Sequence, residues 1–131
     1  MIIDHVGIAV ANIEESLSFY GKAFGLEVVH REEVLSQKVK VAFLKGGETS
    51  IELLEPAAEG GAVAKFIKER GPGLHHVAFA VKNIKSEIAR LTTAGIAPLE
   101  ALPRAGARGH LVCFLHPRYA QGVLVEMVEH V

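Results

Sequence analysis

Apolar and polar positions change their spacing along the chain in a definite order. Residues 2–10 alternate as a half-buried strand does, and Asn12 then stands at a helix N-cap position with Glu15 three residues later. Helical spacing follows at Ile13, Leu17, Tyr20 and Phe24. Three strand-like runs come next, at residues 26–34, 38–46 and 49–55, and Gly46-Gly47 marks a turn between the last two. This half of the chain therefore predicts a βαβββ module.

The second half of the chain predicts the same order of elements. Asn83 is its expected N-cap, and one helical face carries Ile84, Ile88 and Leu91. The strand-like runs here are residues 97–102, 110–116 and 122–129. Between the halves, residues 57–71 combine a small-residue linker with a short amphipathic helix that ends at Gly71.

The two halves also share sequence. IDHVGIAVANI, from Ile3 to Ile13, returns as LHHVAFAVKNI from Leu74 to Ile84, with six of eleven positions identical and an offset of 71 residues. VAFL from Val41 matches VCFL at that offset, and SIELLE from Ser50 matches LVEMVE at an offset of 74. Three matches in one order indicate a duplicated folding unit.

Together these patterns predict an α+β fold in which tandem βαβββ modules form one curved mixed sheet. Neither module can bury the apolar face of its strands alone, so we expect one domain over residues 1–131. Module one is residues 1–56, the linker and short helix are residues 57–71, and module two is residues 72–131.

Composition narrows the function. The net charge of −1 argues against a nucleic-acid partner, and no apolar run reaches the roughly 20 residues that span a bilayer. The amino terminus has an acid where a secretory signal needs basic residues, so we expect a cytoplasmic protein. The single cysteine, Cys113, lies in the apolar run LVCFL and is expected to be a buried core thiol.

Four polar residues occupy equivalent places in apolar strands of the two copies: His5, Glu52, His76 and Glu126. A single strand histidine is usually a satisfied core or surface residue, and strand alternation alone leaves each glutamate free to face water. An ionised carboxylate in an apolar strand is costly without a partner, and a divalent cation is one such partner. The duplicated set of two imidazoles and two carboxylates favours a metal site for zinc, iron, cobalt, nickel or manganese.

The other histidines are weaker candidates. His75 precedes His76, and neighbouring strand residues point to opposite faces, so only one of the two can enter a common site. Surface or loop positions are expected for the four that have no repeat partner, His30, His110, His116 and His130.

The chain resembles the vicinal oxygen chelate superfamily, which includes glyoxalase I, extradiol dioxygenases and antibiotic-resistance proteins. Within it the sequence is most similar to the methylmalonyl-CoA epimerases. The resemblance covers essentially the whole chain and is carried by IDHVGIAV, SIELLEP, AVAKFIKERGPGLHHVAFAV, RAGARGH and FLHPRYAQGVLVE. Glyoxalase I relatives read closer to DPDG where this chain has HPRYAQG.

The resemblance implies a set of roles for these residues. The family's metal ligands fall on His5, Glu52, His76 and Glu126, although some epimerases carry Gln at the Glu52 position. Glu126 is the implied proton-transfer residue. A second acid/base of several epimerases falls on Val41, which cannot act as one, and the polar residues near it are Gln37 and Lys40.

The implied activity is a metal-dependent epimerase that interconverts (2R)- and (2S)-methylmalonyl-CoA through a metal-stabilised enolate, with cobalt, manganese, zinc or nickel as the cofactor. A coenzyme A thioester is the implied partner. Arg108 and Gly106 lie in a basic, glycine-containing loop that is suited to its phosphates. A basic loop that only faces solvent explains these residues equally well. We expect a homodimer, the default assembly. Two alternatives remain: a glyoxalase I-type lactoylglutathione lyase, and a non-catalytic small-molecule-binding protein of the resistance type.

Overall fold

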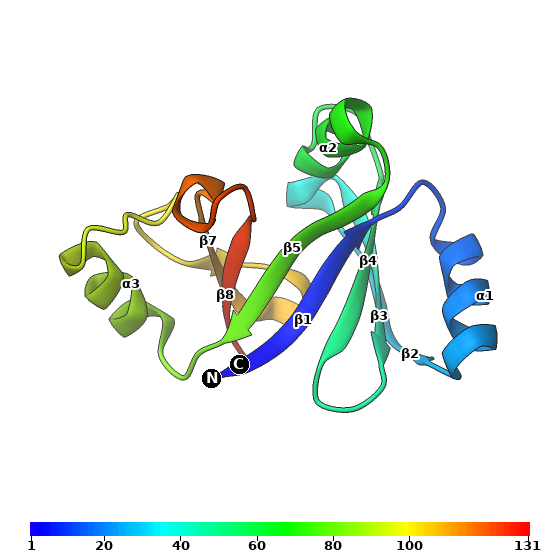
Figure 1. Ribbon diagram of the computed structural model, residues 1–131, viewed down its shortest axis with the longest axis horizontal. Helices are drawn as coiled ribbons and strands as arrows, with labels where there is room; N and C mark the ends of the chain where they lie inside the picture. Colours follow the sequence, from blue (N-terminus) through cyan, green and yellow to red (C-terminus); the bar gives the residue numbers. More distant parts are fainter. The chain divides into compact units, whose positions relative to one another are not determined.

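The computed structural model describes all 131 residues, which divide into two compact units. The first unit is His5–His75, and the second unit is Met1–Asp4 with His76–Val131. The elements in chain order are β1 (Ile2–Ala9), α1 (Ile13–Phe24), β2 (Glu27–Val34), β3 (Val39–Lys45), β4 (Ser50–Pro56), α2 (Ala62–Arg70), β5 (Gly73–Ala80), α3 (Ile84–Thr93), β6 (Arg104–Ala105), β7 (Leu111–Leu115) and β8 (Val125–Glu129) (Figure 1). The predicted βαβββ order therefore occurs twice, separated by the predicted short helix.

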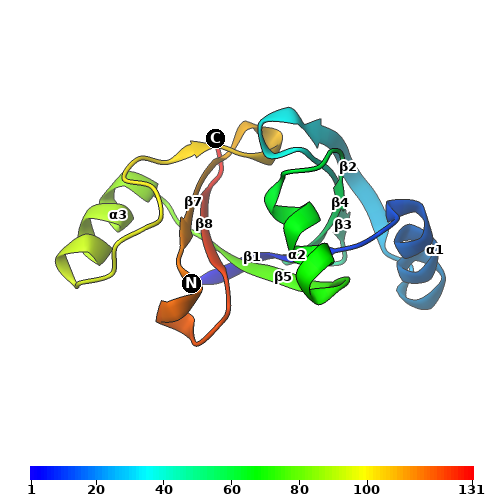
Figure 2. The ribbon, with the colours of Figure 1, turned by 90° about the horizontal axis from the view of Figure 1, so that it is seen from above.

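The first unit combines parallel and antiparallel strand pairs. β1 runs parallel to β4, while β3 lies antiparallel to both β4 and β2. Helix α1 packs on one face of these strands through a core of Val10, Ile13, Ala42, Leu44 and Leu53. Figure 2 shows α1 and α2 on opposite sides of β3 and β4. The three predicted strands of this half are confirmed to within about one residue at each end.

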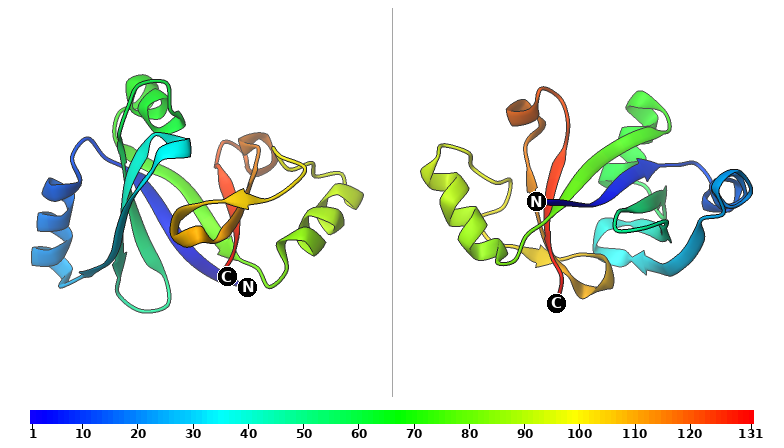
Figure 3. Two further views of the ribbon diagram at one scale, coloured as in Figure 1. Left: turned by 180° about the vertical axis from the view of Figure 1, so that it is seen from behind. Right: turned by 60° about the horizontal axis from the view of Figure 1, so that its bottom comes forward.

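The second unit repeats the mixed pairing. β5 runs parallel to β8, and β7 lies antiparallel to β8 and to the two-residue strand β6. Helix α3 lies beside β7 and β8 (Figure 3), where Ile84, Ile88 and Leu91 pack with Cys113 and Met127. The helical face predicted for residues 84–91 and the buried Cys113 thiol are both confirmed.

The strand predicted at residues 97–102 is wrong. That segment makes only an isolated bridge between Pro98 and Leu115, and the ladder resumes as β6 at Arg104–Ala105. Pro98 and Pro103 have no backbone N–H to donate, so a continuous ladder cannot form across the segment. The last strand also begins at Val125 rather than at residue 122, because the turn Pro117–Ala120 and Gly122, at a positive φ of 101°, come first.

Helices α1 and α3 begin in the same way. The side chain of Asn12 accepts a hydrogen bond from Glu15 N at 3.0 Å, and Asn83 accepts one from Ser86 N at 3.0 Å, which confirms both predicted caps. A second acceptor comes from a distant strand in each case. Ile13 N donates to Glu55 Oε1 at 2.8 Å, and Ile84 N donates to Glu129 Oε1 at 2.7 Å. A carboxylate here also opposes the positive end of the helix dipole, which ties the helix to the last strand of its module.

None of the three α-helices has both the length and the apolar character that crossing a membrane requires.

Candidate metal centre

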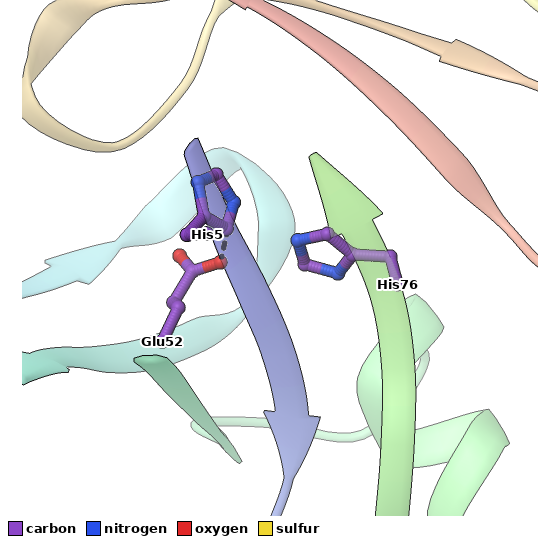
Figure 4. Close-up of side chains that lie close together, drawn as sticks. All are labelled: His5, Glu52 and His76. Atoms are coloured by element: carbon purple, nitrogen blue, oxygen red, sulfur yellow. Dashed lines mark ion pairs between the residues drawn. The ribbon is translucent and has the colours of Figure 1, made fainter. Parts of the chain in front are cut away.

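The four predicted ligands are all buried and form two equivalent pairs. In the first unit His5 Nε2 lies 3.3 Å from Glu52 Oε1 (Figure 4), with 5% and 7% of the two side chains exposed. In the second unit His76 Nε2 lies 3.3 Å from Glu126 Oε2, with 3% and 6% exposed. The structure thus brings each predicted histidine together with the predicted glutamate of its own repeat.

Strand register explains why each pair forms. Glu52 on β4 lies opposite Gly7 on β1, and Glu126 on β8 lies opposite Ala78 on β5. Each histidine is two residues before that small partner, so its side chain points to the same sheet face as the glutamate. Helices α1 and α3 pack on the other face, against Leu53 and Met127, the residues that follow the two glutamates. Each His–Glu pair therefore lies on the sheet face away from its module's helix.

A phenylalanine that the sequence pattern did not single out accompanies each pair. Phe43 lies opposite Glu52 in the β3–β4 ladder, and Phe114 lies opposite Glu126 in the β7–β8 ladder. Each ring meets its histidine edge to face, with centroids 5.7 Å apart for His5 and Phe43 and 5.9 Å for His76 and Phe114. These contacts restrict the orientation of the imidazoles. The matching VAFL and VCFL segments carried this signal, since the two phenylalanines are equivalent in the repeat.

The donor set fits a divalent cation. Two neutral imidazoles and two carboxylates are the ligand types that zinc, manganese, cobalt and nickel accept. Burial alone would penalise each ionised carboxylate, and one histidine offsets only part of that cost. The chemistry of the two pairs is therefore what a metal centre needs.

The remaining histidines occupy varied positions. His75 lies on β5 with its ring 5.0 Å from that of Phe66, edge to face. His116 caps the turn at Pro117–Ala120 through Arg118 N, and the rings of His110 and His130 stack 4.2 Å apart. His30 lies within β2, inside the strand predicted at residues 26–34, where its side chain is 33% exposed and pairs with Glu32 at 2.8 Å. The bulge at Val28/His30 sets which face it occupies, and spacing alone does not reveal that bulge.

The basic loop lies in the second unit, around Ala107–Gly109. Arg108 is solvent-exposed and has a positive φ of 62°, while Arg104 stacks over the Phe114 ring at 5.7 Å. A Cβ added at Gly106 would lie 3.0 Å from Val112 Cγ1, so close packing alone explains a glycine at this position, without a bound phosphate. The contact of Arg108 and Gly106 with a phosphate stays a prediction.

Val41 stands where the resemblance implies a second acid/base, and the structure shows its surroundings. Val41 is buried in β3 with 2% exposed, Lys40 is exposed on the same strand, and Gln37 ends the 3₁₀ turn before it. Val41 lies opposite Glu32 in the β2–β3 ladder.

Comparisons with known proteins agree with this architecture. Residues 4–114 match the sequence profile of the glyoxalase/bleomycin resistance protein/dioxygenase superfamily. YqjC of Bacillus subtilis, described as uncharacterized, is 39% identical over 127 residues, which cover 97% of this chain and 91% of that protein. The ethylmalonyl-CoA/methylmalonyl-CoA epimerase of Cereibacter sphaeroides is 38% identical over 128 residues, with 95% of each chain covered.

A solved structure extends the comparison to three dimensions. A variant methylmalonyl-CoA epimerase of Streptomyces coelicolor, in complex with 2-nitronate-propionyl-CoA, matches with a TM-score of 0.95 and 36% identity. The match covers 100% of this chain and 95% of that one. The predicted glyoxalase-like fold and the predicted resemblance to methylmalonyl-CoA epimerases are both confirmed.

Proposed function

Because the chain belongs to the glyoxalase/bleomycin resistance protein/dioxygenase superfamily, we propose that it is an epimerase that interconverts (2R)- and (2S)-methylmalonyl-CoA. The observation that carries the proposal is the duplicated, buried His–Glu pair, His5 with Glu52 and His76 with Glu126. Relatives at 36–38% identity that are named as such epimerases support the choice of substrate.

His5, Glu52, His76 and Glu126 together would hold one divalent cation, with cobalt, manganese, zinc or nickel compatible with the ligand set. Such a cation supplies Lewis-acid polarisation of the thioester carbonyl, worth several kcal/mol of transition-state stabilisation. Edge-to-face contacts with Phe43 and Phe114 hold the two imidazoles in orientation, and the burial of all four proposed ligands keeps water away from them.

Inversion of the α-carbon needs a proton taken from one face and returned on the other. Glu126 is the proposed proton-transfer residue on one side. Its carboxylate is 6% exposed and lies opposite Phe114 in the ladder, so bulk water competes little for the proton. A carboxylate that serves as a ligand would be a weak base, so proton transfer by Glu126 would require a weaker hold on the cation.

The phosphates of coenzyme A would bind the basic loop of the second unit. Arg108 is exposed there, and Arg104 and Arg118 are exposed close to it in sequence. No acid lies between Ala101 and Val125, and Glu100, just before this stretch, pairs with Arg104 at 3.1 Å. We expect the active form to be a homodimer.

The proposal is tested with purified protein loaded with cobalt or manganese. Proton NMR in deuterium oxide should show solvent deuterium entering the α-carbon of methylmalonyl-CoA, with a polarimetric or coupled-enzyme assay reporting inversion. A preparation with metal bound that neither exchanges nor inverts the α-carbon would end the epimerase proposal. Turnover of a glutathione hemithioacetal by the same preparation would favour the lyase alternative instead.

A further inference from the structure

Strand β2 of the first unit carries an acid–imidazole pair with no counterpart in the second unit. His30 Nε2 lies 2.8 Å from Glu32 Oε1, and the side chains are 33% and 31% exposed. The two residues are two positions apart on one strand, so both face the same side. Partial exposure leaves the carboxylate accessible to a bound substrate, while the imidazole fixes its position.

Strand register places this pair on the face that carries His5 and Glu52. His30 lies opposite Phe43, and Phe43 lies opposite Glu52 in the next ladder. The neighbouring row runs from Glu32 through Val41 to Leu54. Directly opposed residues in a sheet point to the same face, so Glu32 and Glu52 share the face away from α1.

Glu32 and Glu52 lie in neighbouring rows of this face, two residues apart along the strands. β2 and β4 are two strand spacings apart, about 10 Å between backbones. The floor between them is apolar, formed by Val41 and Phe43 with 2% and 6% of their surface exposed. On this face of β1 to β4 in the first unit, Glu32 and Glu52 are the only carboxylates that are at least partly buried.

We propose that Glu32 is the second acid/base of the reaction, and this inference rests on the proposed epimerase function. One carboxylate takes the α-proton, and the electron pair of the broken C–H bond passes into the enolate. A protonated carboxyl on the other side gives its proton to the α-carbon, which forms the new C–H bond on the opposite face. The two carboxyl groups have then exchanged protonation states, and no oxidant or reductant is consumed.

Glu32 suits this role better than Glu52. A carboxylate that binds a cation loses basicity, because the positive charge stabilises its ionised form. Glu52 is one of the proposed ligands, whereas Glu32 lies two strands from it and has an imidazole as its partner. His30 acts as a positioning residue, because its Nε2 holds the carboxylate of Glu32 in place.

The test compares Glu32→Gln with Glu33→Gln in the metal-loaded enzyme. Glu33 is the next residue on β2, is exposed and lies on the opposite face. We expect Glu32→Gln to lower the kcat for inversion by about 10²-fold or more, the usual contribution of a general acid or base. Deuterium exchange at the α-carbon should persist within about tenfold for one epimer only, because Glu126 still serves that side. Glu33→Gln should match the wild type in both assays.

Metal content, measured by plasma emission, should be the same in the wild type and Glu32→Gln. Loss of metal in Glu32→Gln, inversion at the wild-type rate, or equal loss of exchange from both epimers would each overturn the assignment. A wild-type enzyme that never exchanges the α-proton would instead overturn the proposed function itself.

The role of His30 gives a second readout. His30→Phe should lower kcat about tenfold with KM nearly unchanged, and His30→Gln, which keeps a donor, should recover most of that loss. Wild-type kcat in His30→Phe would remove the positioning role. Glu32→Asp keeps a carboxyl on a shorter arm, so its inversion rate should fall between those of the wild type and Glu32→Gln. A rate no higher than that of Glu32→Gln would count against the acid/base role.

Discussion

The two modules carry the same residue types on the strands that hold their His–Glu pairs, and they differ at their second strand. Each has a buried His–Glu pair at 3.3 Å, a phenylalanine opposite the glutamate, and a glutamate from its last strand bonded to the start of its helix. In the first module the second strand is the eight-residue β2, with His30 and Glu32 on the sheet face away from α1. In the second, a proline-containing segment leads to the two-residue β6 and a basic loop.

This difference separates the metal ligands, which the proposed site needs from both modules, from the groups that it needs from one module only. A shared cation requires equivalent ligands from both copies, so the strands that carry them retained their pattern. An acid/base on one side of the substrate and a phosphate-binding loop on another are single requirements. We propose that β2 supplies the first of these in module one, and that the loop after β6 supplies the second in module two.

The largest expected effect comes from removing one imidazole from either module. His5→Ala and His76→Ala should each lower the epimerisation rate by about 10³-fold, because the loss of Lewis-acid assistance costs several kcal/mol. The two variants should agree within about tenfold. Initial rates and metal content of each purified variant provide the measurement.

His75→Ala is the matched control for this prediction. His75 precedes His76 on β5 but packs against Phe66, so metal content and rate should stay within about twofold of the wild type. A large loss in only one of His5→Ala and His76→Ala would mean that the modules do not contribute equally.

A smaller effect is expected on stability from the strand-to-helix carboxylates. Glu55→Ala and Glu129→Ala each remove the acceptor of a helix-terminal N–H, which should lower the free energy of unfolding by about 1–2 kcal/mol. Urea denaturation measures the change, and Glu48→Ala in the exposed turn after β3 is the control. Equal costs would support equivalent modules, whereas a negligible cost for one would break the equivalence.

The basic loop should influence binding more than chemistry. Arg108→Ala removes the proposed phosphate partner and should raise the KM for methylmalonyl-CoA about tenfold, or roughly 1.4 kcal/mol, with kcat within about twofold. A pantetheine thioester lacking the nucleotide phosphates should show no such change. Arg90→Ala, on α3 and paired with Glu87, serves as the control. An equal effect on both substrates would exclude a phosphate role for Arg108.

The smallest effect concerns a core position where the copies differ, Ala42 in one and Cys113 in the other. Burial raises the pKa of the Cys113 thiol, with the nearby charge of Glu100 adding to it. The unfolded chain then loses this proton first as the pH rises, so the free energy of unfolding falls above about pH 8.5. Cys113→Ala should show less of this fall when urea denaturation at pH 8 and pH 10 is compared. The same fall in both proteins would contradict the prediction.

The sequence predicted the fold, and it singled out four residues whose role as metal ligands is a proposal. The repeat identified His5, Glu52, His76 and Glu126, because side chains kept in both copies stand out against apolar strands. Phe43 and Phe114 were visible in the same matches but have no polar chemistry to single them out. The irregular segment after α3 was mistaken for a strand, since its apolar alternation outweighed Pro98 and Pro103 in the prediction.

Other features depend on long-range register that spacing does not reveal. The bonds from Glu55 and Glu129 to the helix starts span 42 and 45 residues. The face of His30 and Glu32 is set by the bulge in β2, and neither residue has a repeat partner to mark it. These features required the ladders of the folded chain.

The most direct test of the account is the stoichiometry of metal binding. Titration of metal-free protein with cobalt, followed by native mass spectrometry, should give one ion per chain, and either Glu52→Ala or Glu126→Ala should weaken that single site. Two ions per chain, or full-affinity binding by one His–Glu pair after the other pair has been removed, would contradict the claim that the copies share one cation.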